Sequence, residues 1–127
     1  MSASDPARAS HTRSADIAAY VTKDGSLVRE LMHPEHHASR TQSLAEATVA
    51  PGATTALHRH RTTEELYHIV SGCGLMTLGD ERFELRPGDT VCIAPGTAHC
   101  IANNGSVPLV ILCCCAPAYR HEDTQLL

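Results

Sequence analysis

Short runs of alternating apolar and polar residues, separated by turn-forming residues, extend through most of this chain. Alternation with period two is typical of β-strands that bury one face, and glycine, proline and asparagine favour the turns between such strands. We find no long helical period and no internal repeat. The pattern predicts strands over residues 26–32, 43–49, 54–60, 65–70, 75–78, 82–85, 90–93, 99–102 and 107–115.

These strands predict a single all-β domain. Strands of four to eight residues at regular spacing, with a turn after nearly every one, are typical of an antiparallel sandwich or barrel. Residues 1–17 show no periodic apolar pattern, so we expect a flexible N-terminal arm there and one domain over residues 18–127. A chain of 127 residues is long enough for one modest core and too short for two.

Composition and charge narrow the classes of partner. The formal net charge is -4 and the sequence has no basic cluster, which argues against nucleic acid or an anionic membrane. No apolar run is long enough to span a bilayer, and the first twenty residues lack the apolar core of a secretory signal, so we expect a cytoplasmic protein. The chain has no Trp and one Phe. With so few aromatic rings for stacking, small polar or anionic ligands fit best.

Three of the six cysteines are consecutive, at Cys113, Cys114 and Cys115. Adjacent cysteines seldom meet the distance and direction that a disulfide needs, so we interpret them as reduced thiols. On a strand, Cys113 and Cys115 face one side and Cys114 the other. We expect these cysteines to act as small buried apolar side chains. The alternative is a redox or metal-buffering role.

One segment framed by two glycines carries the clearest chemical pattern. It reads Gly52, five residues, His58, one residue, His60, four residues, Glu65, six residues, Gly72. Because side chains alternate along a strand, His58 and His60 point to the same side and can share one metal ion. The Glu65 carboxylate and a third imidazole from a distant strand would complete a shell of three nitrogens and one oxygen, with room left for water or substrate.

A second segment carries Gly88, Gly96, His99 and Asn103. Together, the two segments resemble the paired signature motifs of the cupin superfamily, in its small single-domain form that is often described as mannose-6-phosphate isomerase-like or dioxygenase-like. The first motif agrees throughout. In the second, Ala94 stands where the pattern has a proline and Pro95 follows, which loosens a turn but removes no ligand. The resemblance implies an antiparallel double-stranded β-helix, or jelly-roll, barrel with a metal inside.

The resemblance also implies a ligand set and a candidate catalytic residue. The spacing within the first motif selects Glu65 over Glu64 as the carboxylate. The implied centre is one divalent transition metal (iron, manganese, nickel, copper, cobalt or zinc) held by His58, His60, Glu65 and His99. Alternation from Glu65 puts Tyr67 on the inward side, where its phenol can bind substrate, act as an acid or base, or only fill the barrel. His68 then points away from the metal.

The favoured hypothesis is a metal-dependent dioxygenase, isomerase or lyase that acts on a small polar or anionic metabolite. Three neutral imidazoles and one carboxylate around a divalent ion carry a charge of about +1, which would attract anionic or chelating ligands. The alternatives are a non-catalytic module that binds or senses a small ligand, and a structural metal-holding protein to which the histidine-rich loop over residues 34–39 contributes. Exposed sheet edges and a thin core favour a homodimer.

Overall fold

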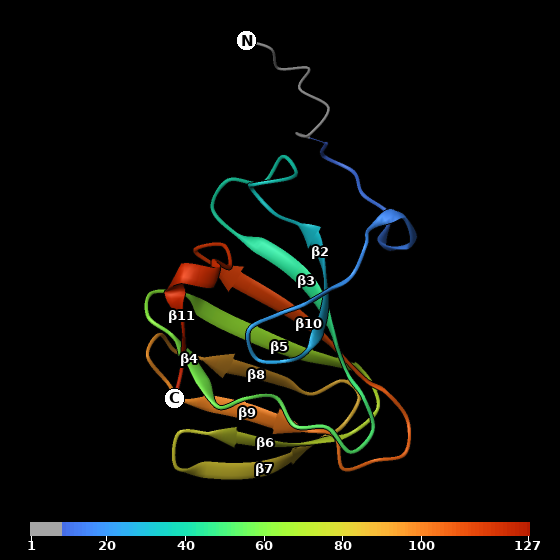
Figure 1. The fold of residues 1–127 in the computed structure, drawn as a ribbon, viewed down its shortest axis with the longest axis vertical. Coiled ribbons are helices and arrows are strands. Elements are labelled where there is room, and N and C mark those ends of the chain that lie inside the picture. The colour runs from blue at the N-terminus through green and yellow to red at the C-terminus, as the bar shows by residue number, and fades with distance from the viewer. Residues whose placement is uncertain (1–8) are drawn as a thin grey trace.

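The computed structural model describes residues 9–127. Within them, eleven strands form two antiparallel sheets (Figure 1). The six-stranded sheet has the order β1 (Tyr20–Val21), β2 (Leu27–Met32), β3 (Ser43–Val49), β10 (Leu109–Ala116), β5 (Glu64–Ser71) and β8 (Thr90–Ile93). The five-stranded sheet has the order β11 (Thr124–Leu126), β4 (His58–His60), β9 (His99–Ala102), β6 (Gly74–Leu78) and β7 (Glu81–Leu85). The predicted all-β antiparallel barrel is confirmed.

Helical structure in residues 9–127 is limited to short 3₁₀ turns, including η2 (Ser14–Asp16) and η3 (His121–Asp123). No helix in this part of the chain has the length and apolar character needed to cross a membrane. Of the predicted N-terminal arm, residues 1–8 lie outside the described residues. The following residues run beside β2, where Thr12 Oγ1 donates a hydrogen bond to Leu31 O at 2.6 Å.

Most predicted strands are present with small shifts at their ends, and β3, β8 and β9 begin and end where the sequence predicts. The prediction was wrong for the strand over residues 54–60, because β4 starts only at His58. Before it, Thr55 N donates to Ile101 O and Ala56 N donates to Asp24 O, at 3.0 and 2.8 Å. The strands β1 and β11 were not predicted, since two or three residues are too few to show alternation.

The barrel interior changes from apolar to polar along its length. On β5 the buried side chains are Ile69, Tyr67 and Glu65, and on β10 they continue from Ile111 to Cys113 and Cys115. The register pairs Ile111 with Ile69, Cys113 with Tyr67 and Cys115 with Glu65, so both strands become polar toward the same end. The apolar end holds the core, and the polar end is left for chemistry.

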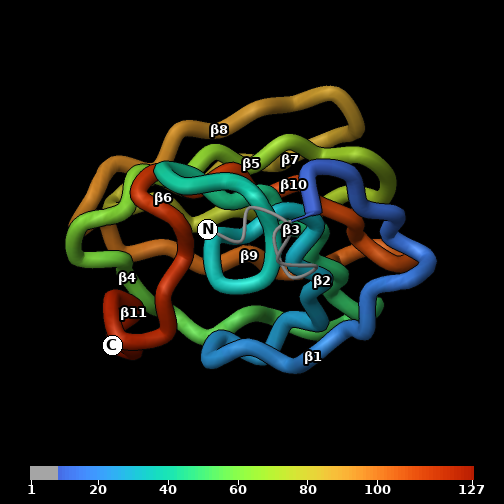
Figure 2. Tube along the Cα trace, turned by 90° about the horizontal axis from the view of Figure 1, so that it is seen from above, coloured from blue at the N-terminus to red at the C-terminus, as the bar shows by residue number. Residues whose placement is uncertain are grey.

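Small side chains open a space at the polar end. On β3, Ala47, Ala45 and Ser43 stand opposite Ile111, Cys113 and Cys115. Figure 2 shows β11 beside β4, with which it pairs, and the turn of the β1–β2 hairpin meets the segment that leads into β4, where Ala56 N donates to Asp24 O. Segments from both ends of the described chain therefore meet the strand that carries His58 and His60.

Two glycines with the same φ allow the stability cost of steric crowding to be measured apart from the cost of a positive φ. Gly52 and Gly72 both have φ of 79°. A Cβ on Gly72 would lie 2.5 Å from Pro108 O and 2.9 Å from Leu109 Cα, whereas one on Gly52 would meet nothing within 4 Å. We expect Gly52→Ala to lower the free energy of unfolding by about 1–2 kcal/mol through its positive φ alone. Gly72→Ala should lower it by a further 2 kcal/mol, roughly, because the backbone around Pro108 must move. Urea unfolding of both variants measures the difference, and equal losses would contradict the crowding.

Candidate metal centre

The three predicted imidazoles lie together at the polar end of the barrel. His58 and His60 are on β4, and His58 pairs directly with His99 on the neighbouring strand β9. All three are buried, and their ligand nitrogens lie within 4.8 Å of one another. Among the described residues, this is the one such cluster. The β4–β9 pairing thus joins two motifs that are far apart in the sequence.

Hydrogen bonds fix how each ring is turned. The Nδ1 atoms of His58, His99 and His60 contact Ala56 O at 2.8 Å, Thr97 O at 2.9 Å and Thr124 Oγ1 at 3.1 Å. A carbonyl oxygen can only accept, so Nδ1 of His58 and of His99 carries the proton. The Thr124 hydroxyl donates to Arg120 O at 3.1 Å, so its oxygen accepts from His60 Nδ1–H in the same way. In neutral imidazoles this leaves a lone pair on each Nε2, and these atoms form the cluster.

Glu65 adds a carboxylate from the opposite sheet. Its Oε1 lies 3.0 Å from His60 Nε2 and 3.6 Å from His99 Nε2. Burial acts to raise the pKa of Glu65, but hydrogen bonds and positive charge from the Nε2 side of His60 and His99 outweigh it and lower the pKa to about 2, which requires a proton, or a cation in its place, between these rings and the carboxylate. The carboxylate is therefore ionised at neutral pH. The four predicted ligands are brought together, whereas the adjacent Glu64 is exposed.

The three imidazole Nε2 atoms and the Glu65 carboxylate are stable close together only with a positive charge between them. With Nδ1–H of His60 committed to Thr124, the short Nε2–Oε1 contact is stable only with a proton or a cation between the two atoms. His99 Nε2 is buried without any hydrogen-bond partner. Burial and the neighbouring His99 lower the pKa of His58, which opposes protonating that ring. Three imidazole nitrogens and one carboxylate oxygen fit a divalent transition metal.

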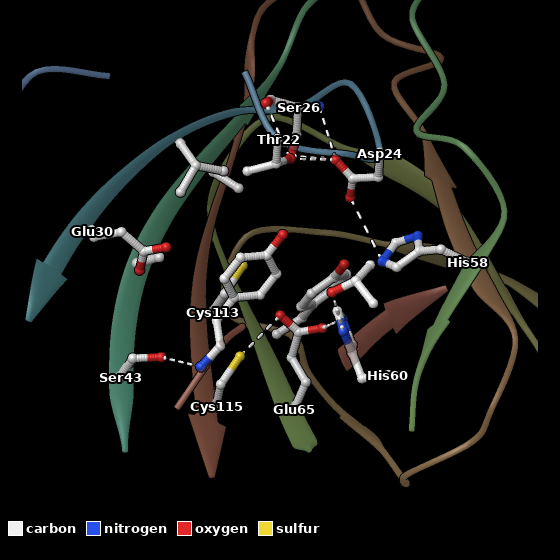
Figure 3. A pocket seen from close by; sticks show the side chains of 16 residues that line it. Thr22, Asp24, Ser26, Glu30, Ser43, His58, His60, Glu65, Cys113 and Cys115 are labelled. Carbon is white, nitrogen blue, oxygen red and sulfur yellow. Dashed lines mark hydrogen bonds and ion pairs between the residues drawn. The ribbon is translucent and has the colours of Figure 1, made fainter. Parts of the chain in front are cut away.

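A cavity of about 50 Å³ adjoins the cluster. Sixteen residues line it, and they include the carboxylates of Asp24 and Glu30 but no Lys or Arg (Figure 3). Lys23-Asp24-Gly25 is a turn-forming sequence, but nothing in the sequence indicates that either carboxylate faces the site, because neither belongs to the two motifs. Asp24 is placed by the contact of its turn with the segment before β4, where Ala56 N donates to Asp24 O, and Glu30 by the pairing of β2 with β3, opposite Ala45.

Tyr67 lies inward, as the alternation predicts. It is buried, and the centre of its ring is 6.0 Å from that of His99. Burial and the negative charge of Glu65 raise the pKa of Tyr67 well above its ordinary value, so the phenol stays protonated. This favours a hydrogen-bond donor or acid over a base. His68, next in sequence, is exposed, and its Nδ1 lies 2.8 Å from Thr90 Oγ1.

Two of the three consecutive cysteines also face the cavity. Cys113 and Cys115 are buried, Cys114 is half-buried, and none of the six cysteines forms a disulfide. Burial raises the pKa of both buried thiols, which keeps them protonated. Cys115 Sγ donates to Glu65 Oε2 at 3.4 Å. These contacts fit the interpretation as reduced buried thiols, with Cys115 also orienting the carboxylate.

Comparisons with known proteins extend this description. Residues 45–115 match a family model described as a cupin domain. An uncharacterized protein of Methanocaldococcus jannaschii is 56% identical over 111 residues, which covers 87% of this chain and 89% of that protein. The mannose-1-phosphate guanylyltransferase of Escherichia coli is 32% identical over 76 residues, 60% of this chain but 16% of that enzyme. A solved structure, a predicted oxalate decarboxylase of Thermotoga maritima, has a TM-score of 0.73 at 23% identity and covers 84% of this chain and 97% of that one.

Asp123 clamps the loop between His60 and Glu65. Its buried carboxylate accepts hydrogen bonds from Thr62 Oγ1 at 2.8 Å, Thr62 N at 3.0 Å and Thr63 N at 3.2 Å. Burial acts to raise the pKa of Asp123, but these hydrogen bonds outweigh it and the pKa is lowered from its usual 3.8. Because the folded pKa is the lower one, ionised Asp123 stabilises the fold above about pH 4 and loses this effect as the pH falls through the folded pKa.

We expect Asp123→Asn to lower the free energy of unfolding by about 2 kcal/mol at pH 7, because an amide cannot accept all three bonds. The difference from the wild type should shrink as the pH falls below about 4, where the unfolded chain binds the proton first, and should vanish once the pH is below the lower folded pKa of Asp123. Urea unfolding at pH 7 and pH 3 measures both values, with Asp80→Asn in the exposed β6–β7 turn as the control. A loss that is equal at the two pH values would contradict the clamp.

Proposed function

This chain belongs to the cupin family, and on that premise we propose that it is a metal-dependent enzyme acting on a small polar metabolite. The proposed centre is one divalent transition metal held by His58, His60, His99 and Glu65. The observation that carries the proposal is the convergence of three imidazole Nε2 atoms, one of them buried and unpartnered, on an ionised carboxylate. When bound, such a metal supplies Lewis acidity toward a carbonyl or hydroxyl oxygen.

The cavity supports a neutral rather than an anionic substrate. From the sequence we expected a small polar or anionic ligand, because a divalent ion with Glu65 as its one carboxylate carries a charge of about +1. In the structure, Asp24 and Glu30 also line the cavity, and no cationic side chain there balances them. With these carboxylates, a divalent ion no longer leaves net positive charge to attract an anion. The small volume of the cavity further supports a ligand of few heavy atoms that carries hydroxyl or carbonyl groups.

Glu30 and Tyr67 supply hydrogen-bonding groups for such a ligand. Tyr20 Oη donates to Glu30 Oε2 at 2.7 Å, whereas Glu30 Oε1 is buried without a partner. Burial raises the pKa of Glu30, which brings its proton exchange closer to neutral pH. In Figure 3 the Glu30 carboxylate enters the cavity from the side opposite His58 and His60. A hydroxyl bound between the two sides would have a partner on each.

These groups favour proton-transfer chemistry. A carboxyl with a raised pKa and a protonated phenol in one cavity are suited to giving and taking protons during isomerisation or elimination. We therefore propose an isomerase or lyase ahead of a dioxygenase. Non-catalytic binding of the same ligand is the second candidate, because every feature that would hold a substrate would also hold a signal molecule. The predicted homodimer stays a prediction.

The first test of the proposed function is metal binding. We expect His99→Ala to weaken the binding of Co²⁺ or Mn²⁺ more than about 100-fold, because even outer partners of metal ligands are typically worth 10- to 100-fold. Isothermal titration of metal-free protein measures this, and His68→Ala on the exposed face of β5 is the matched control. Wild-type protein that binds none of the transition metals offered would overturn the proposal.

Turnover separates the enzyme from the binding module. We expect metal-loaded protein to isomerise or dehydrate at least one compound in a panel of small hydroxy-carbonyl compounds without consuming oxygen. Chelation should abolish this activity, and Tyr67→Phe should lower it by about 100-fold if the phenol transfers a proton. Proton NMR of the mixture, with an oxygen electrode alongside, measures both. Metal-dependent ligand binding without turnover would favour the second candidate, and oxygen uptake would favour a dioxygenase.

A further inference from the structure

A second carboxylate faces the three-histidine cluster from the side that Glu65 leaves open. Asp24 lies in the turn between β1 and β2, outside both motifs. Its Oδ2 is 3.7 Å from His58 Nε2, the contact drawn as a dashed line in Figure 3. Glu65 contacts His60 and His99. The two carboxylates together thus face all three imidazoles.

The turn holds the Asp24 side chain in one orientation. Its Oδ1 accepts hydrogen bonds from Thr22 Oγ1 at 2.7 Å, Ser26 N at 2.9 Å and Ser26 Oγ at 2.7 Å. The turn itself is closed by Thr22 N donating to Ser26 O at 3.0 Å. With Oδ1 fixed by three donors, Oδ2 is directed toward the histidines. An aspartate that only stabilises a surface turn has no need for its second carboxylate oxygen to face buried histidines.

The same turn is attached to the segment that carries His58. Ala56 N donates to the main-chain oxygen of Asp24 at 2.8 Å, and Ala56 O accepts from His58 Nδ1–H at 2.8 Å. Lys23 Nζ also donates to Thr124 O at 2.9 Å, which ties the turn to β11. One residue, Ala56, therefore sets the position of Asp24 and the rotation of the His58 ring. Their separation is built into the fold.

His58 faces a carboxylate oxygen in the same way as His60 does. Nδ1–H of His58 is committed to Ala56 O, so its Nε2 lone pair faces a carboxylate oxygen. Two electron-rich atoms held at this distance inside a barrel repel one another unless a positive charge lies between them. We propose that Asp24 is a second carboxylate ligand of the metal centre, which would then comprise three imidazoles and two carboxylates. This inference rests on the proposed metal site.

A second carboxylate has two chemical consequences. It makes the centre neutral with a divalent ion, which reduces the cost of placing that ion in a buried cavity. It also raises the number of protein ligands to five, beyond the four of a tetrahedral zinc site, and adds an oxygen donor of the kind that suits manganese and iron. The expected preference is for Mn²⁺, Fe²⁺ or Co²⁺ in a five- or six-coordinate shell.

The test compares Asp24→Asn with Asp89→Asn. The amide keeps an oxygen for the hydrogen bonds at Oδ1 but cannot offer a charged ligand atom at Oδ2. Asp89 is exposed, sits in the turn before β8 and accepts from Arg86 N at 2.9 Å, so its replacement makes the same charge change in a turn that does not line the cavity. We expect Asp24→Asn to weaken Co²⁺ binding at least about tenfold, and Asp89→Asn to leave it unchanged.

The visible spectrum of bound Co²⁺ provides a readout that is independent of affinity. Loss of a ligand changes the coordination of Co²⁺ and hence the intensity of its d–d bands, whereas a purely long-range charge effect does not. Asp24→Glu, which keeps the charge but moves the carboxylate, should change the spectrum as well, and it provides the test if the asparagine variant fails to fold. Unchanged affinity, or lower affinity with an unchanged spectrum, would overturn the role of Asp24 while leaving the proposed function standing. Wild-type protein that binds no Co²⁺ or Mn²⁺ would overturn both.

Discussion

The commitment of each imidazole's Nδ1–H to a fixed acceptor is the constraint on which the site depends. His58 and His99 find this acceptor two residues back along their own chain, at Ala56 O and Thr97 O. Both motifs thus use the same local device: a backbone carbonyl just before the strand turns the ring so that Nε2 faces inward. His60 lacks such a neighbour and relies on Thr124 of β11. One of the three rings is therefore oriented by a distant segment.

The division of the barrel into an apolar and a polar end explains how a small domain holds this cluster. The fully buried large side chains, such as Ile69, Met76, Ile101 and Ile111, stabilise the fold at one end. At the other, Ala45, Ala47 and Ser43 fill less space and leave the cavity. Buried carboxylates and imidazoles cost stability unless they are paired, so concentrating them at one end keeps that cost away from the core.

Much of the fold and the four clustered residues could be predicted from the sequence, because their signals are local. Alternation located β3, β8 and β9 at their observed ends and placed His58 and His60 on one side of a strand, while the resemblance to the paired cupin motifs selected Glu65 and His99. Asp24, Glu30 and Thr124 could not be found in this way. Asp24 and Thr124 reach the site because a turn or a three-residue strand folds against a segment distant in the sequence, and such packing leaves no periodic pattern. Glu30 lies on a predicted strand, but the sequence does not show that this strand pairs with β3 beside the site. Asp24 shows this most clearly, since Lys23-Asp24-Gly25 is a turn-forming sequence but does not reveal the direction of the Asp24 side chain.

The unpartnered Nε2 of His99 has a thermodynamic consequence beyond chemistry at the site. With the proposed metal bound at this nitrogen, ion occupancy would be coupled to folding, because an ion that binds the native barrel and not the open chain shifts the equilibrium toward the native state. His58 and His99 meet only after both motifs have found each other across the sheet. Free cation concentration, as much as temperature, would then determine what fraction of molecules is native, and a chain deprived of its ion would be exposed to proteolysis sooner.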